Sequence, residues 1–200
     1  YAPLRSAVRA CARNAAVIIA TDHALEPVVQ RHLAPRDGQM VTIPNGLDLV
    51  ELGATAAKAD GQLLRQRHGF AAGETVFLSV GRLEHNKGFD LLARALATAT
   101  TPGSGLAARG WRWVIAGNGP YRQTLQTLVE ASGLSSHVVF AGRVSDVDLH
   151  AWYEAATVFV HPSRYEGSSL VTLEAMAHRR PVIATRAGGL PDKVLPGVTG

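Results

Sequence analysis

The fold is decided by the stretch 75-TVFLSVGRLEHNKGFDLLARALAT-98, in which a short apolar run precedes a glycine-containing loop and an amphipathic segment. An apolar run of this length favours a buried strand, and leucines and alanines that recur every three or four positions favour a helix. Strand, loop and helix in this order are typical of proteins in which helices cover a parallel sheet. The stretch therefore predicts an α/β fold.

The same alternation continues in both directions along the chain. We expect strands at Ala16–Ala20, Met40–Ile43, Thr75–Val80, Arg112–Ala116, His137–Ala141, Thr157–Val160 and Pro181–Thr185. We expect helices at Leu4–Asn14, Leu25–Leu33, Gln62–His68, Phe89–Thr98, Tyr121–Ser132, Val147–Ala155 and Ser169–His178. The five strands between Glu74 and Thr185 predict a doubly wound sheet, whose ligands bind beyond the carboxyl ends of the strands.

A turn signal at Pro44-Asn45-Gly46 divides the chain, and residues 49–60 after it show no convincing period. We therefore expect one domain over residues 1–43 and a second over residues 44–200. The chain opens at Tyr1 rather than at Met and stops at Gly200 after a glycine-rich turn. We interpret it as a fragment whose second domain is truncated at its C-terminus.

Composition narrows the classes of protein that fit. The longest apolar run, Ala15 to Ala20, is far shorter than the ~20 residues of a membrane span. The single cysteine, Cys11, fits a reducing compartment and predicts a cytoplasmic location. The eight histidines lack metal-ligand spacing, so we interpret them as surface or capping residues and expect no bound metal. The net charge of +4 suits an anionic ligand, but no basic run with interleaved aromatics predicts nucleic-acid binding.

The loop after the strand at residues 75–80 carries two cations, Arg82 and Lys87, and opens into a helix. Fixed positive charge beside the free N–H groups of a helix N-terminus suits a diphosphate, and the glycines at 81 and 88 let the backbone approach it. The alternative is a solvated loop in which Arg82 pairs with Glu84.

A later loop, 161-HPSRYEGSSLVTLEAMA-177, places Glu166 before a predicted helix and Glu174 within it, with seven residues between them. We expect Ser168 to cap this helix and Glu174 to lie beside a buried face marked by Leu170 and Leu173, roughly 7–8 Å along the axis from the helix start. A carboxylate there suits two vicinal ribose hydroxyls, while Glu166 stays free to meet a group carried by the phosphates.

Both glutamates also have plainer interpretations. Glu166 stands at the capping-box spacing from Ser163, and Glu174 could be an ordinary exposed helical acid. From the residues of this loop alone, the two interpretations stay open.

Six pieces of the chain, taken together and in order, resemble glycosyltransferase family 4, which has the GT-B fold. They are Ile43-Pro44-Asn45-Gly46-Leu47-Asp48, the loop from Gly81-Arg82 to Lys87-Gly88, Ala116-Gly117-Asn118-Gly119-Pro120, Phe140-Ala141-Gly142-Arg143-Val144, the glutamate pair, and Gly188-Gly189-Leu190-Pro191-Asp192. The resemblance implies a Rossmann-like donor-binding domain over residues 44–200 and, in residues 1–43, the end of a second Rossmann-like domain that faces the acceptor.

The resemblance also implies a reaction and a site. The reaction is retaining transfer of a sugar, of the hexosyltransferase type, from a nucleoside diphosphate donor of the UDP or GDP type to a sugar, lipid-linked or small-molecule acceptor. No cofactor or metal is implied. Arg82 and Lys87 would bind the diphosphate and, with Glu166 on the donor sugar, form the catalytic set. The remaining implied contacts are Ser169 and Leu170 with the distal phosphate, Glu174 with the ribose, and Val144 and Asp146 with the base.

Departures from the family pattern leave the donor sugar open. Asp192 stands where the family commonly has Glu, and Ser168-Ser169 replaces a more apolar pair. Two rival functions remain: a nucleotide-sugar epimerase of the GT-B fold, and a nucleotide-sugar-binding fragment without activity of its own. A dinucleotide oxidoreductase fits poorly, because Arg122 stands where its fingerprint needs a third glycine.

Three arginines, Arg5, Arg9 and Arg13, recur every four residues on the first predicted helix. They suit phospholipid headgroups, which would make the protein peripheral to the inner face of the membrane, or they form a solvated face.

Overall fold

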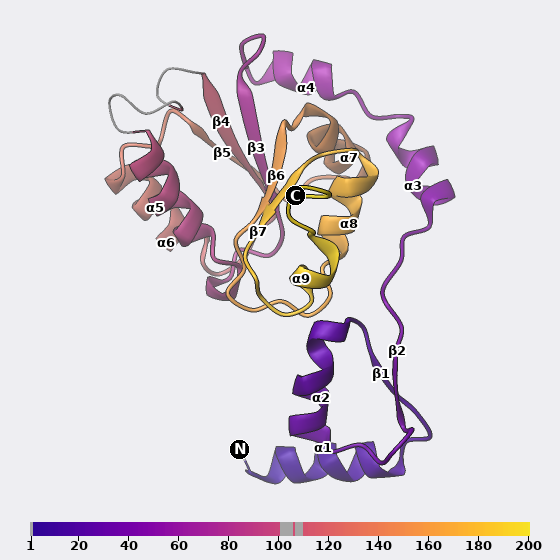
Figure 1. Cartoon of the computed structure of the whole chain (residues 1–200). Helices are drawn as coiled ribbons and strands as arrows, with labels where there is room; N and C mark the ends of the chain where they lie inside the picture. Colours follow the sequence, from indigo (N-terminus) through magenta and orange to yellow (C-terminus); the bar gives the residue numbers. More distant parts are fainter. Residues whose placement is uncertain (1, 101–105, 107–109) are drawn as a thin grey trace.

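A computed structural model describes residues 2–100, 106 and 110–200 of the chain. It contains two parallel sheets, one of two strands in the order β1-β2 and one of five strands in the order β5-β4-β3-β6-β7. Figure 1 shows them as two units, a small N-terminal one and a larger one, connected by an extended segment that leads into α3.

The elements of the described residues follow the expected alternation. The strands are β1 (Ile18–Ala20), β2 (Met40–Thr42), β3 (Thr75–Val80), β4 (Trp111–Ala116), β5 (Val138–Gly142), β6 (Val158–His161) and β7 (Val182–Ala184). The α-helices are α1 (Ala2–Asn14), α2 (Glu26–Leu33), α3 (Leu49–Ala56), α4 (Gly61–Arg67), α5 (Phe89–Ala99), α6 (Arg122–Ala131), α7 (Asp146–Ala155), α8 (Leu170–Ala177) and α9 (Leu190–Lys193). Short 3-10 turns cover His23–Leu25 and His85–Lys87.

The larger sheet is doubly wound, as the sequence predicts. From β3 in its centre the chain moves outward to β4 and β5, and then returns to the other side of β3 for β6 and β7. Helices α5 and α6 pack on one face, where Phe89, Leu125 and Trp113 are buried, and α7 and α8 pack on the other, where Tyr153 and Ala175 are buried. The strand order therefore reverses between β3 and β6, where such sheets bind their ligands.

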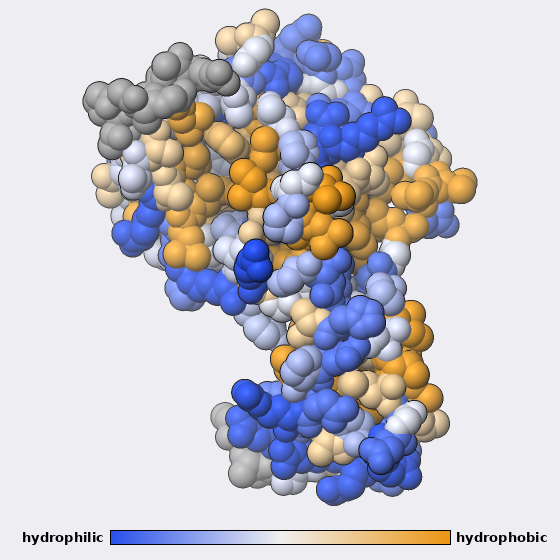
Figure 2. Space-filling view, in the orientation of Figure 1, coloured by the Kyte–Doolittle hydropathy of each residue, from blue (hydrophilic) through white to orange (hydrophobic). Residues whose placement is uncertain are grey.

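The N-terminal unit is a single β-α-β crossover with α1 packed against α2. Four large apolar residues in or directly beside its strands are exposed, namely Val17, Ile19, Val41 and Ile43. Figure 2 shows apolar surface on this unit. The unit contacts the larger one through Asp22, which pairs with Lys193 although 171 residues separate them. The backbone N–H of Ala24 also donates to Asp192 Oδ2 at 2.9 Å.

Two helices were not expected from the sequence, α3 and α9. Residues 49–60 show no convincing period, yet α3 begins at Leu49, where the Asp48 side chain accepts from the N–H groups of Val50 and Glu51 at 2.9 and 3.0 Å. The helix has no buried residue, so its sequence carries no apolar period.

Among the described residues, no helix combines the length and the apolar character needed to cross a membrane.

Candidate active site

A cavity of about 260 Å³ opens at the point where the strand order reverses. It lies between the loop that follows β3 and the loop that leads into α8. Its lining residues are Val80, Gly81, Arg82, Lys87, Glu166, Ser168, Ser169, Leu170 and Val171. The fold therefore brings five of the eight predicted site residues into one cavity.

Glu166 is the most strongly held side chain in this cavity. Its Oε2 accepts from Lys87 Nζ at 2.8 Å and from His161 Nε2 at 2.6 Å, and Ser163 Oγ lies 3.3 Å away. Burial opposes ionisation of this carboxyl, but the hydrogen bonds from His161 and Lys87 outweigh it and lower the pKa of Glu166 to about 2. Glu166 is therefore a carboxylate at neutral pH.

The expectation that Glu166 stays free is wrong for one of its two oxygens. Oε2 is occupied by the three donors, whereas Oε1 accepts no hydrogen bond within the described part of the chain. Ser163 contacts Glu166, as the capping-box interpretation expected, but Glu166 lies before α8 and not in a helical turn, so the pair does not cap a helix. One carboxylate oxygen remains for a ligand.

Arg82 pairs with Glu84, with Nη2 2.7 Å from Oε1, as the alternative interpretation of this loop expected. The Arg82 side chain is 76% exposed, so this pair is weak and easily exchanged for another anion. Arg82 also lines a second, larger cavity of about 430 Å³ together with Gly81, Gly117, Asn118 and Arg143. Arg82 thus stands between two cavities at the ends of β3 and β4.

The N-terminus of α8 faces the first cavity. The helix is capped by Ser169, whose Oγ accepts from Thr172 N at 3.3 Å, and not by Ser168 as expected. The N–H groups of Ser169, Leu170 and Val171 donate no hydrogen bond among the described residues, so they are available to an anion. The expected buried face is also wrong: Leu170 is 44% exposed, and the buried positions are Thr172 and Ala175.

Glu174 lies four residues after the start of α8 and lines a different cavity of about 260 Å³. Asp146, at the start of α7, and His150 line the same cavity, together with Asp48 and other residues of the α3 segment. Asp146 and Glu174, the residues that the resemblance implies for the base and the ribose, therefore line one cavity. Val144 is not among the lining residues and packs, half-buried, against the core.

The glycines of these loops allow backbone segments to pack closely against each other, more than they allow a ligand to approach. A Cβ on Gly88, whose φ is +66°, would lie 1.9 Å from the carbonyl oxygen of Pro162. A Cβ on Gly188 would lie 1.6 Å from the carbonyl oxygen of Glu166. Glycine at these two positions therefore brings the Lys87 loop and the β7 loop against the segment that carries Glu166.

Sequence reasoning missed two residues that hold the glutamates. His161 was interpreted as a surface or capping residue, but it is 2% exposed and contacts Glu166. Its place as the last residue of β6 was the available signal. The hydroxyl of Tyr153, from α7, lies 2.8 Å from Glu174 Oε2, and no local pattern points to that contact. No group of three His, Cys, Asp or Glu side chains suited to a metal ion occurs within residues 2–100, 106 and 110–200.

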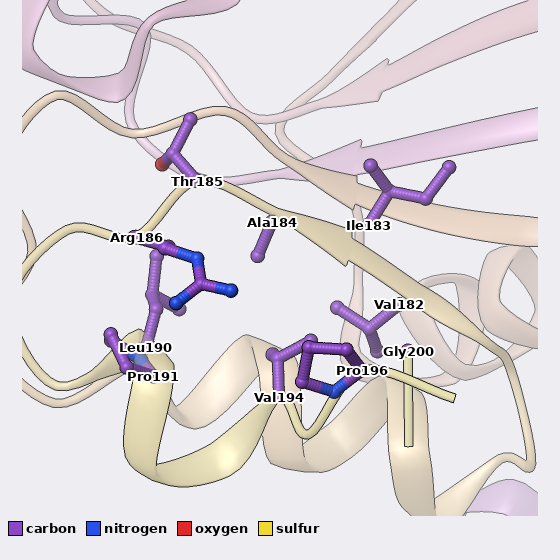
Figure 3. Close-up of a pocket in the computed structure, with 10 residues that line it drawn as sticks. All are labelled: Val182, Ile183, Ala184, Thr185, Arg186, Leu190, Pro191, Val194, Pro196 and Gly200. Atoms are coloured by element: carbon purple, nitrogen blue, oxygen red, sulfur yellow. The ribbon is translucent and has the colours of Figure 1, made fainter. Parts of the chain in front are cut away.

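A further cavity of about 260 Å³ lies between β7 and α9 and is mostly apolar. Figure 3 shows Val182, Ala184 and Ile183 on the strand and Leu190 and Val194 on the helical side. Its charged lining residue is Arg186, and none of the eight predicted site residues reaches it. The cavity at the strand reversal is therefore the better candidate.

A family model described as "Glycosyl transferases group 1" matches residues 60–200. Among curated proteins, the chain is 38% identical over 146 residues to the GDP-mannose-dependent alpha-(1-6)-phosphatidylinositol monomannoside mannosyltransferase of Mycolicibacterium smegmatis, covering 68% of this chain and 36% of that protein. It is 32% identical over 196 residues to the alpha-D-kanosaminyltransferase of Streptomyces kanamyceticus, covering 98% of this chain and 48% of that protein. The chain thus spans half or less of the length of these relatives.

Solved structures resemble the whole chain. Alr3699/HepE of Anabaena, in complex with UDP and glucose, superposes with a TM-score of 0.80 at 28% identity, covering 100% of this chain and 52% of that one. Sucrose-phosphate synthase of Thermosynechococcus elongatus gives 0.79 at 30% identity, covering 98% of this chain and 47% of that one. These likenesses confirm the predicted Rossmann-like α/β fold of a GT-B donor-binding domain.

Proposed function

Because the chain belongs to the glycosyl transferases of group 1, we propose that it binds the nucleoside diphosphate of a nucleotide-sugar donor, in a protein that transfers the sugar with retention. The finer assignment that we propose is glycosyltransferase family 4. Residues 1–43 would form the last part of the acceptor-side domain, and residues 44–200 would form the donor-binding domain. We expect this chain by itself to bind donor without transferring sugar, because transfer needs both walls of the cleft.

The observation that carries this proposal is the cavity at the strand reversal. Lys87 and Arg82 supply cations on one side of it, and the N-terminus of α8 supplies free N–H groups on the other. A diphosphate between them would be opposed by fixed charge and by oriented amides without a metal ion. Arg82 and Lys87 would bind the diphosphate, and Ser169 and Leu170 would donate to its distal phosphate.

The adjacent cavity suits the rest of the nucleotide. Glu174 would accept hydrogen bonds from the ribose hydroxyls, and Asp146 would face the base, with Val144 behind it. Glu166 Oε1 would meet the donor sugar, which makes Glu166, Arg82 and Lys87 the catalytic set. Relatives differ in donor, since one is named for GDP-mannose and a solved neighbour holds UDP and glucose, so both UDP and GDP donors are candidates.

The test is a thermal-shift and calorimetric panel of UDP, GDP and ADP with their sugars. We expect one diphosphate to stabilise the chain in proportion to ln(1 + [L]/Kd). Lys87→Ala should weaken that diphosphate, whereas the exposed Lys58→Ala, outside both cavities, is the matched control and should not. Absence of binding by every diphosphate, or equal losses in the two lysine variants, would contradict the proposal. Conversion of a donor sugar without acceptor would favour the epimerase.

A further inference from the structure

The side chain that orients Glu174 comes from another helix. The Tyr153 hydroxyl, on α7, lies 2.8 Å from Glu174 Oε2 and 3.2 Å from the carbonyl oxygen of Val171, both on α8. No other hydrogen bond reaches the Glu174 carboxylate among the described residues. Tyr153 therefore determines which oxygen of Glu174 is left for a ligand, and that oxygen is Oε1.

Tyr153 is suited to this task because its ring is enclosed by the core. Its side chain is completely buried, and its ring lies 5.8 Å from that of Phe159 and is stacked on His178 at 5.3 Å with an interplanar angle of 16°. Burial, followed by the nearby Glu174 charge, raises the pKa of Tyr153 well above 10, so the hydroxyl remains a donor at neutral pH. A fixed donor removes rotamer freedom from a glutamate side chain that would otherwise lose it on binding a ligand.

We infer that Tyr153 is a positioning residue for the nucleotide ribose, which it serves by holding the Glu174 carboxylate toward the cavity shared with Asp146 and His150. The inference rests on the proposed function. Tyr153 itself does not line that cavity, so it acts through Glu174 and not by touching the nucleotide. Its loss should be felt only by ligands that carry the hydroxyls that Glu174 binds.

The experiment is a cycle of two substitutions and two ligands, measured by calorimetry on the 200-residue chain. Tyr153→Phe keeps the buried ring and removes the donor. The ligands are UDP or GDP, whichever binds, and its 2′,3′-dideoxy form. We expect Tyr153→Phe to weaken the ribonucleotide about 2- to 10-fold and the dideoxynucleotide less than about 2-fold. In the Glu174→Ala background, Tyr153→Phe should cause no further loss, because the two residues act as one unit.

Tyr121→Phe is the control, since the Tyr121 hydroxyl makes no hydrogen bond within the described residues, and it should change neither ligand. Thermal unfolding identifies any variant that has lost its fold. If the Tyr153→Phe chain unfolds, Glu174→Gln and Glu174→Ala are compared on the same two ligands instead. Equal losses for both nucleotides, or additive losses in the double variant, would overturn the inference alone. A parent chain that binds no nucleoside diphosphate would overturn the proposed function and this inference with it.

Discussion

Lys87 Nζ lies 2.8 Å from Glu166 Oε2, although 79 residues separate them, and both side chains line the cavity where the strand order reverses. The cation proposed for the donor diphosphate is thus already paired with the carboxylate proposed for the donor sugar. The Lys87 side chain is 20% exposed and that of Glu166 10%, so the pair is poorly screened by solvent. An incoming diphosphate must share Lys87 with Glu166.

Stability should fall on acidification in two separate windows. His178 is half-buried beside His150 and Arg180, and burial is the largest cause that lowers its pKa from 6.5 to about 4. Between pH 6.5 and 4 the unfolded chain therefore binds a proton that the folded chain does not, and stability falls as the pH falls. Glu166, with a pKa of about 2 against 4.5, adds a second loss between pH 4.5 and 2.

Urea unfolding at a series of pH values measures both windows. His178→Gln should flatten the curve between pH 6.5 and 4 and leave the lower window in place, whereas Glu166→Gln should do the reverse. The two variants serve as controls for each other. Identical pH profiles in both variants and the parent chain would show that neither group is linked to folding as its surroundings indicate.

A buried ion pair joins the N-terminal unit to the larger one. Asp22 is 2% exposed, the Lys193 side chain is 6% exposed, and Gly189 lies against the Asp22 carboxylate. Lys193→Met should cost about 3–5 kcal/mol of unfolding free energy, because it leaves Asp22 charged and buried without a partner. The double variant with Asp22→Asn should recover much of that loss. If urea unfolding shows the same loss of unfolding free energy in the single and the double variant, the charge of Asp22 is not the cause of that loss.

The sequence predicts the elements that depend on neighbouring residues better than the contacts that join distant parts of the chain. The β3 strand at Thr75–Val80 and the helix beginning at Phe89 are predicted to the residue, because local periodicity encodes them. Helix α3 was missed, because none of its residues is fully buried and only Asp48 marks its start.

Local periodicity could not predict which side chains contact the predicted site residues. The contacts of Lys87 with Glu166 and of Tyr153 with Glu174 span 79 and 21 residues. No period or spacing within one segment specifies such pairs, which depend on how the helices pack. Glu166 and Glu174 were therefore recognisable as candidates, but the orientation of their carboxylates was not.

Nucleoside diphosphate binding should not depend on a divalent metal. Lys87, Arg82 and the free N–H groups of α8 already oppose the charge of a diphosphate in the cavity. Calorimetric titration in EDTA and in Mg²⁺ or Mn²⁺ should give the same dissociation constant. A requirement for either ion would show that the cations of this loop do not replace a metal, and the role proposed for Lys87 and Arg82 would fall.

The two glutamates of the site should have different roles. Glu174 should accept from the ribose, so Glu174→Ala should weaken nucleoside diphosphate binding by about 10- to 100-fold, the loss expected for a hydrogen bond to a charged group. Glu166→Gln should leave the bare diphosphate as tightly bound as before or tighter, because it frees Lys87 from its carboxylate partner. In the longer protein that contains both walls of the cleft, Glu166→Gln should nevertheless depress transfer, because its contact forms with the sugar where charge develops. Calorimetry with the diphosphate and initial rates with the intact donor measure the two effects. His161→Leu, which removes a donor to the same oxygen, tests whether the orientation of Glu166 matters. Equal loss of diphosphate affinity in the Glu166 and Glu174 variants would mean that the sugar and ribose ends of the site are wrongly assigned.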